Sequence, residues 1–213
     1  MFDPAAPLPR GPHRLTREQV AASQRGRLLA AVTTLVAERG YAAVTIGDLA
    51  GEAGVSRAAF YEHFADKQEC LLAAYDVFAA HVVAAMAAPL DDDASWPAFV
   101  EQAVVGYLTA MESEPVAARA FLLEMDAAGP PARMRRREGV RQFAAVMAAH
   151  HAQLIARDPA MRALPDRIYL ALAYGVRELV RDALEDEAHP PLTDLAPDVV
   201  SWVLTTVAGA GRG

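Results

Sequence analysis

Apolar residues recur at intervals of three and four along most of this chain, and no useful stretch alternates apolar with polar residues as a strand would. The pattern predicts an all-α protein of about nine helices. The first helix is expected over 16–39, after a Pro-rich arm at 1–15, and two short helices follow Thr45 and Ser56. The remaining helices are expected over 66–87, 95–113, 115–126, 132–157, 165–187 and 196–209.

Capping residues and glycines define the ends of the first helices. Gly40 can end the first helix, and Thr45 and Ser56 are suitable N-caps for the second and third. Gly54 can adopt the left-handed conformation that ends the second helix. Asp66, followed by Glu69 at the capping-box position, begins the fourth helix.

Two short helices joined by a glycine-containing turn form a helix-turn-helix pattern. In the second of them, Phe60 and Phe64 are four residues apart and face inward, so Arg57, Ala58 and Tyr61 share the outward face. In this motif that face enters the major groove of DNA. The Arg57 guanidinium can bond O6 and N7 of guanine together. The alternative is a helical hairpin in an ordinary core.

The stretch "TIGDLAGEAGVSRAAFYEHFADKQECLLAAY", preceded by "RGRLLAAVTTLVAERGYAAVT", resembles the DNA-binding domain of the TetR family of bacterial transcriptional regulators. The resemblance covers about Arg25 to Phe78. It implies a three-helix DNA-binding domain at 16–67, a linking helix at about 66–87, and a helical ligand-binding and dimerisation domain at 80–213. It also implies double-stranded operator DNA, a small-molecule effector and a second copy of the chain as partners.

The same resemblance assigns roles to individual residues of the DNA-binding domain. Ser56, Arg57 and Ala58 correspond to the base-reading start of the third helix. Contacts with the phosphate backbone are implied for Arg25, Thr45, Tyr61, His63 and Lys67, the last being the only lysine in the chain.

For the C-terminal domain, the resemblance implies that the last two helices pair with those of a second copy in a four-helix bundle. Apolar stripes on these helices agree, although both could instead pack within one subunit. The candidate interface residues are Leu172, Gly175, Val176, Leu179, Val180, Val200, Val203, Leu204 and Val207.

Aromatic residues and methionines at helical spacing mark a candidate effector pocket, although such residues also fill ordinary cores. The candidates are Trp96, Phe99, Tyr107, Met111, Phe121, Met125, Phe143, Met147, His151 and Tyr174. Their character predicts an apolar effector. His151 could be a hydrogen-bonded core residue or a ligand contact. No second ligand has convincing spacing for a metal, so neither a metal nor a cofactor is expected.

Composition narrows the class of protein. A hydrophobic content of 54% with 22% charged residues excludes global disorder, and the net charge of -7 argues against indiscriminate nucleic-acid binding. No apolar run reaches the roughly 18 residues of a membrane span, and the N-terminus lacks the apolar region of a signal peptide. With a single cysteine, Cys70, these features predict a cytoplasmic protein without a membrane partner.

The favoured function is therefore a dimeric repressor that binds a palindromic operator and is released by a small apolar effector. An activator of the same family and a helical interaction module without DNA binding stay open. An enzyme is not expected, since the sequence has no nucleophile elbow, metal pair or phosphate loop. Cys70 could be a redox sensor or a packing residue. The arginine-rich run at 133–141 could be a second nucleic-acid patch, but a solvated helix start is the favoured interpretation.

Overall fold

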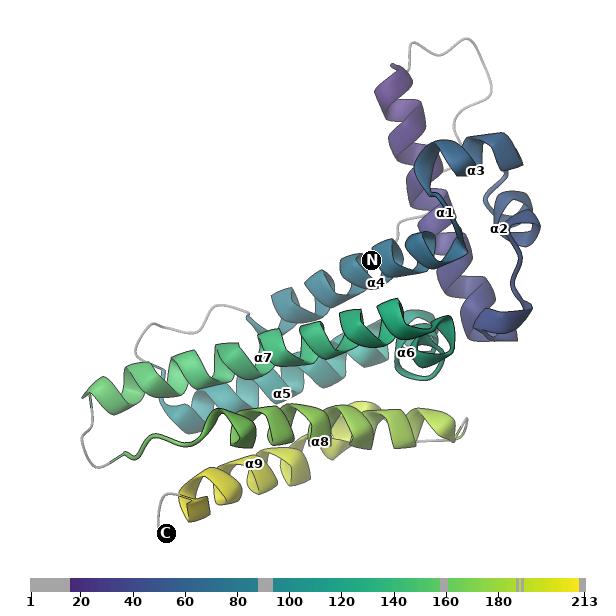
Figure 1. Cartoon of the computed structure of the whole chain (residues 1–213). Helices are drawn as coiled ribbons and strands as arrows, with labels where there is room; N and C mark the ends of the chain where they lie inside the picture. The colour runs from purple at the N-terminus through teal and green to yellow at the C-terminus, as the bar shows by residue number, and fades with distance from the viewer. Residues whose placement is uncertain (1–15, 88–93, 158–160, 187, 189, 211–213) are drawn as a thin grey trace. The chain divides into compact units, whose positions relative to one another are not determined.

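The computed structural model describes residues 16–87, 94–157, 161–186, 188 and 190–210, and these residues form helices and no strand (Figure 1). The predicted all-α fold with nine α-helices is confirmed for this part of the chain. The helices are α1 (Arg17–Arg39), α2 (Ile46–Glu52), α3 (Arg57–His63), α4 (Lys67–Met86), α5 (Trp96–Ser113), α6 (Pro115–Leu122), α7 (Pro130–Arg157), α8 (Asp166–Glu185) and α9 (Ala196–Ala210).

The predicted caps of the first helices are present. Thr45 Oγ1 accepts from Asp48 N at 3.2 Å, and Ser56 Oγ accepts from Ala59 N at 3.0 Å. Gly40 ends α1 with φ 75°, and Gly54 follows α2 with φ 60°. Both glycines have positive φ, which residues with a side chain rarely adopt. Local sequence therefore determines where these helices begin and end.

Three short 3₁₀ helices were not predicted: η1 (Tyr41–Ala43), η2 (Met125–Ala128) and η3 (Leu192–Leu195). The helix predicted over 115–126 ends at Leu122, and η2 follows it and closes at Gly129, whose φ is 93°. The arm at 1–15 and the acidic residues at 91–93 lie outside the described residues.

The chain divides into two compact units, and the first consists of residues up to Phe78 together with Val116–Arg133. Within it, α1 packs against α2 and η1, α2 packs against α3, and η1 packs against η2. Its core is apolar and includes Leu28, Val32, Leu49, Phe60 and Leu71, all of which are fully buried. The Phe121 ring packs against Phe78, with ring centroids 5.2 Å apart.

The second unit consists of Ala79–Pro115 and the residues from Met134 onward. Within it, α5 packs against α9 and η3, and α5, α7 and α8 run side by side (Figure 1). Gly106 of α5 allows a close approach to α4, because a Cβ there would lie 2.3 Å from the Ala85 carbonyl oxygen.

Helix α4 is long and apolar enough to suit a membrane span by length and composition, so the expectation that no apolar segment reaches that length is wrong. Several of its side chains, including Cys70, Leu71 and Phe78, are nevertheless buried in the protein. Such burial is also typical of a core helix.

Candidate nucleic-acid interface and apolar cavity

Helix α3 presents the outward face that its spacing predicted. Phe60 and Phe64 are buried and hold the helix against the core, whereas Arg57, Ala58 and Tyr61 are exposed. The Tyr61 side chain is 58% exposed, and its ring meets Phe60 edge-on with centroids 5.5 Å apart. We call Arg57, Ala58 and Tyr61 the recognition face. It combines a cation, a methyl group and a phenol, each able to contact DNA.

The Arg57 side chain lies against α2. A Cβ atom at Gly47 would lie only 2.4 Å from Arg57 Nη2, so the guanidinium occupies the space that a side chain at Gly47 would need. The nearby Asp48 has a lowered pKa, chiefly because Thr45 donates hydrogen bonds to it, with smaller effects of Arg39 and Arg57. Gly47 thereby helps to set the direction in which Arg57 leaves α3.

Arg27 secures the turn between α2 and α3. Its Nη1 donates to the Ala53 carbonyl at 2.7 Å and to the Gly54 carbonyl at 3.4 Å. Sequence reasoning missed this residue, because 26 positions separate Arg27 from Ala53 and no local pattern connects them.

Several of the predicted phosphate-contact residues make contacts inside the first unit. The Arg25 guanidinium lies 5.3 Å from the centre of the Phe64 ring, and Thr45 is exposed beside its partner Asp48. His63 is half-buried and its Nε2 lies 3.2 Å from Gln24 Oε1. Their contacts with DNA remain predictions.

Lys67 has a structural contact that the sequence did not reveal. Its Nζ donates to the Tyr41 carbonyl at 2.7 Å and to the Val44 carbonyl at 2.6 Å, and it lies 4.1 Å from the centre of the Tyr41 ring. Burial lowers the pKa of Lys67. Two of the three ammonium donors therefore hold the segment that precedes α2. Only the third N–H of the ammonium remains for the predicted phosphate contact.

Two side-chain hydrogen bonds connect Val116–Arg133 with the rest of the first unit. The Glu124 carboxylate accepts from Tyr41 N at 3.2 Å, and Gln68 Nε2 donates to the Ala128 carbonyl at 2.5 Å. These contacts explain why this segment packs with the N-terminal helices although it follows α5 in the chain.

Comparison with known proteins matches the region of the chain that contains the recognition face. The family model described as bacterial regulatory proteins, tetR family, matches residues 28–74, which include α2, α3 and their turn. Residues 28–74 therefore belong to the TetR family. The match ends within α4, so the second unit of the chain lies outside it.

Curated relatives match the same region. The chain is 43% identical over 65 residues to the HTH-type transcriptional regulator CymR of Pseudomonas putida, which is 30% of this chain and 32% of the relative. It is 39% identical over 61 residues to the HTH-type transcriptional activator FasR of Mycolicibacterium smegmatis, which is 29% of this chain and 26% of the relative. The chain thus spans about a third or less of the length of these relatives.

Solved structures resemble the fold over a greater length. The FadR transcriptional regulator of Bacillus subtilis, in complex with stearoyl-CoA, has a TM-score of 0.76 at 16% identity, covering 85% of this chain and 98% of the other. A tetR-family regulatory protein of Rhodococcus RHA1 has a TM-score of 0.66 at 21% identity, covering 86% and 96%. At these identities the likeness concerns the fold alone.

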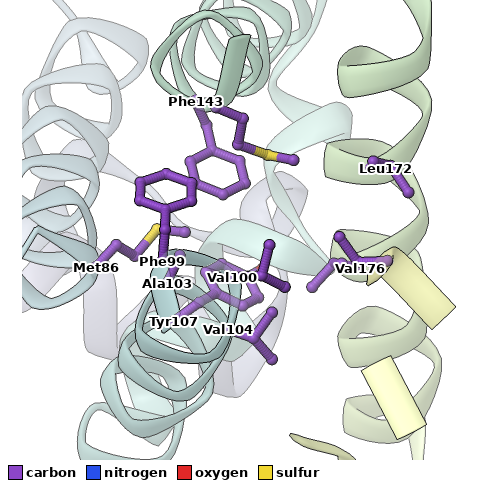
Figure 2. A pocket seen from close by; sticks show the side chains of 11 residues that line it. Met86, Phe99, Val100, Ala103, Val104, Tyr107, Phe143, Leu172 and Val176 are labelled. Atoms are coloured by element: carbon purple, nitrogen blue, oxygen red, sulfur yellow. The ribbon is translucent and has the colours of Figure 1, made fainter. Parts of the chain in front are cut away.

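The second unit contains a small apolar cavity of about 20 Å³, enough for one water-sized molecule. Figure 2 shows side chains from several helices pointing into it. The lining residues are Met86, Phe99, Val100, Ala103, Val104, Tyr107, Phe143, Met147, Leu172, Val176 and Val203. Four predicted pocket residues, Phe99, Tyr107, Phe143 and Met147, are among them.

The other predicted pocket residues lie elsewhere. Phe121 and Met125 are buried in the first unit and do not line this cavity. Met111 is buried and Tyr174 half-buried in the second unit, but neither lines this cavity. Aromatic and methionine spacing shows that a helix has an apolar face, but not which cavity that face borders.

A cluster of aromatic and histidine side chains adjoins the cavity, and we call Trp96, Phe99, His150, His151 and Tyr169 the aromatic–histidine cluster. His151 is only 2% exposed, and its Nδ1 lies 2.5 Å from the Tyr169 hydroxyl. Burial is the main cause of the lowered pKa of both histidines. His151 is thus a hydrogen-bonded core residue, one of the alternatives that its sequence left open.

Helices α8 and α9 have one buried and one exposed apolar face. Leu179 is 47% exposed and Trp202 40% exposed, and a Cβ atom at Gly175 would meet the Trp202 ring at 2.5 Å. Five of the predicted interface residues are instead buried in the core, and the side chains of Val200 and Leu204 are partly exposed. The five buried residues are Leu172, Val176, Val180, Val203 and Val207. They fit the alternative that these stripes pack within one subunit.

Two further features singled out in the sequence are Cys70 and the arginine-rich run at 133–141. Cys70 is fully buried, and burial raises the pKa of its thiol to about 12, so the reactive thiolate is disfavoured. In the arginine-rich run, Arg135 pairs with Glu138 at 2.9 Å on an exposed helix surface. Within the described ranges, no group of three or more His, Cys, Asp and Glu residues is placed to bind a metal.

Proposed function

We propose that this chain is an effector-responsive transcriptional regulator that acts in the cytoplasm as a homodimer on a palindromic operator. The supporting observation is the exposed recognition face on a capped helix-turn-helix within the region that the TetR-family model matches. Phe60 and Phe64 anchor the buried side of α3 to the core, which leaves the exposed start of α3 free to enter a major groove.

In this proposal Arg57 reads a guanine, and Ser56 and Ala58 lie close to neighbouring bases. Arg25, Thr45, Tyr61 and His63 approach the phosphates, with a smaller share for Lys67 because its ammonium already binds two carbonyls. Base contacts give sequence preference, and phosphate contacts give salt-dependent affinity.

A symmetric dimer would place two recognition faces on half-sites about 34–36 Å apart. The exposed Leu179 and Trp202 support α8 and α9 as the dimer surface. Sedimentation of the wild type and of Leu179→Glu tests this part. A wild type that is monomeric at micromolar concentration would contradict it.

Effector release is supported by the apolar cavity, and FadR of Bacillus subtilis shows that a protein of this fold binds stearoyl-CoA. An effector changes DNA binding only if it prefers one conformation of the dimer. Repression is the favoured outcome, and activation is the second candidate because the relative FasR is an activator.

Fluorescence anisotropy with the chain's own upstream DNA, over a range of salt and with competitor DNA, tests the DNA-binding proposal. Arg57→Ala should weaken specific binding by about 1–3 kcal/mol. The matched control Arg162→Ala removes the same charge from an exposed position in the second unit and should leave binding unchanged. Equal effects of both variants, or unaltered binding by Arg57→Ala, would contradict the base-reading role.

A further inference from the structure

The aromatic–histidine cluster lies one helical turn beyond the apolar cavity on three helices. Trp96 precedes the lining residue Phe99 on α5, His150 follows Met147 on α7, and Tyr169 precedes Leu172 on α8. Phe99 belongs to both, because it lines the cavity and stacks on His150 with ring centroids 4.1 Å apart. The cluster therefore adjoins the apolar cavity through Phe99.

Two polar atoms of this cluster are buried without a hydrogen-bond partner in the protein: Trp96 Nε1 and His150 Nε2. Trp96 is 7% exposed, and its ring centroid lies 6.5 Å from that of His150, with the rings close to parallel. An unpaired polar group of this kind costs free energy that a bound polar atom can recover. By contrast, His151 and Tyr169 already bond one another.

The two atoms differ in what they can bind. The indole Nε1–H of Trp96 is a donor only. The Ala94 backbone favours a proton on the His150 ring, and Nε2 has no partner in the protein, so we assign that proton to Nδ1. In the neutral ring Nε2 is then an acceptor. Burial is the larger influence and lowers the pKa of His150, so the ring is neutral near pH 7.

One donor beside one acceptor matches a hydroxyl group, which can accept from Trp96 Nε1 and donate to His150 Nε2. A carboxylate has only acceptors, so it would face the lone pair of His150 without a proton between them. A hydroxyl oxygen that makes both hydrogen bonds at a near-tetrahedral angle joins two atoms about 4–5 Å apart, a span that two rings with centroids 6.5 Å apart can present.

We propose that Trp96 and His150 bind the hydroxyl group of a small effector whose apolar body occupies the cavity next to Phe99 and Met147. This inference rests on the proposed effector response and names the chemical class of the effector. The cavity must enlarge to admit the body of such a molecule, and Met86 and Met147 are the flexible lining residues best able to move.

Calorimetry at pH 7.5 with three matched probes tests the inference. The probes are 4-propylphenol, propylbenzene and 4-propylbenzoate, which share a body and differ in the polar group. We expect the phenol to bind about tenfold or more tightly than propylbenzene, because two neutral hydrogen bonds are added. The benzoate should bind no more tightly than propylbenzene.

Variants assign the preference to the two residues. His150→Phe preserves ring stacking but removes the acceptor, so the preference for the phenol should fall to about threefold or less. His150→Gln places an amide oxygen near the position of Nε2 and should restore part of the preference. The matched control His81→Phe makes the same substitution at a half-buried histidine on α4 outside the cluster and should preserve it. If His150→Phe does not fold by circular dichroism, Trp96→Phe replaces it.

Four outcomes overturn the inference: equal binding of phenol and propylbenzene, a preference that persists in His150→Phe, a preference for the benzoate, or no binding of any probe. The operator-binding assay on the same preparation separates this inference from the proposed function. Specific operator binding without a hydroxyl preference defeats the hydroxyl anchor alone, whereas loss of specific DNA binding with the preference intact defeats the regulator proposal.

Discussion

Lys67→Met separates the structural contact of the only lysine from its predicted phosphate contact. Methionine keeps the length of the aliphatic stem but removes the ammonium that donates to the Tyr41 and Val44 carbonyls. The two hydrogen bonds hold the residues between α1 and α2, so their loss should destabilise the first unit.

The magnitude follows from the geometry of these bonds. A hydrogen bond from a charged donor contributes roughly 1.5–3 kcal/mol. The Lys67 side chain is only partly buried, and burial lowers the pKa of Lys67, which offsets part of the gain. Two such bonds without this offset would contribute about 3–6 kcal/mol, and with it we expect a loss of about 2 kcal/mol for the pair. For a chain of this length, that corresponds to a decrease of about 4–8 °C in Tm.

Urea unfolding followed by far-ultraviolet circular dichroism measures this loss. The control Arg39→Met removes an exposed guanidinium whose nearest carboxylate, on Asp48, is 3.9 Å away, and it should cost less than about 1 kcal/mol. If Lys67→Met unfolds like the wild type but lowers the slope of log affinity against log salt, Lys67 acts as a phosphate contact, and the structural reasoning is refuted.

Three further predictions use other contacts. Gly47→Ala places a methyl group where the Arg57 guanidinium lies, so operator affinity or base preference should change while the melting temperature does not fall; unaltered binding would show that this position does not direct Arg57. Gly106→Ala should destabilise the second unit by about 1–3 kcal/mol, since backbone lies 2.3 Å from the new Cβ, whereas Gly26→Ala, with nothing within 4 Å, should be neutral or stabilising by up to about 1 kcal/mol in denaturant melts. The unfolding free energy should decrease as pH falls below about 6.5, because the unfolded chain then binds protons that the buried histidines resist; His151→Phe should flatten this dependence, and an unchanged slope would contradict it.

Local sequence determined the helices and the first site. Caps such as Thr45 and Ser56, and glycines such as Gly54, act over three or four residues, so their effect can be predicted without knowledge of the fold. The four-residue spacing of Phe60 and Phe64 identified the buried side of α3, and hence the exposed Arg57. The TetR-family resemblance rests on this same region.

Only the tertiary structure decided which neighbour each side chain meets. The contacts of Lys67 with Tyr41 and of Glu124 with Tyr41 span 26 and 83 positions, and no local pattern relates such distant residues. Helical spacing gave α8 an apolar stripe, but packing buried Val180 and left Leu179 exposed. The sequence singled out His151, whereas the structure pairs it with Tyr169 and leaves Nε2 of the adjacent His150 without a protein partner. Periodicity defines an apolar face, while the elements packed against that face determine whether it becomes core, cavity or interface.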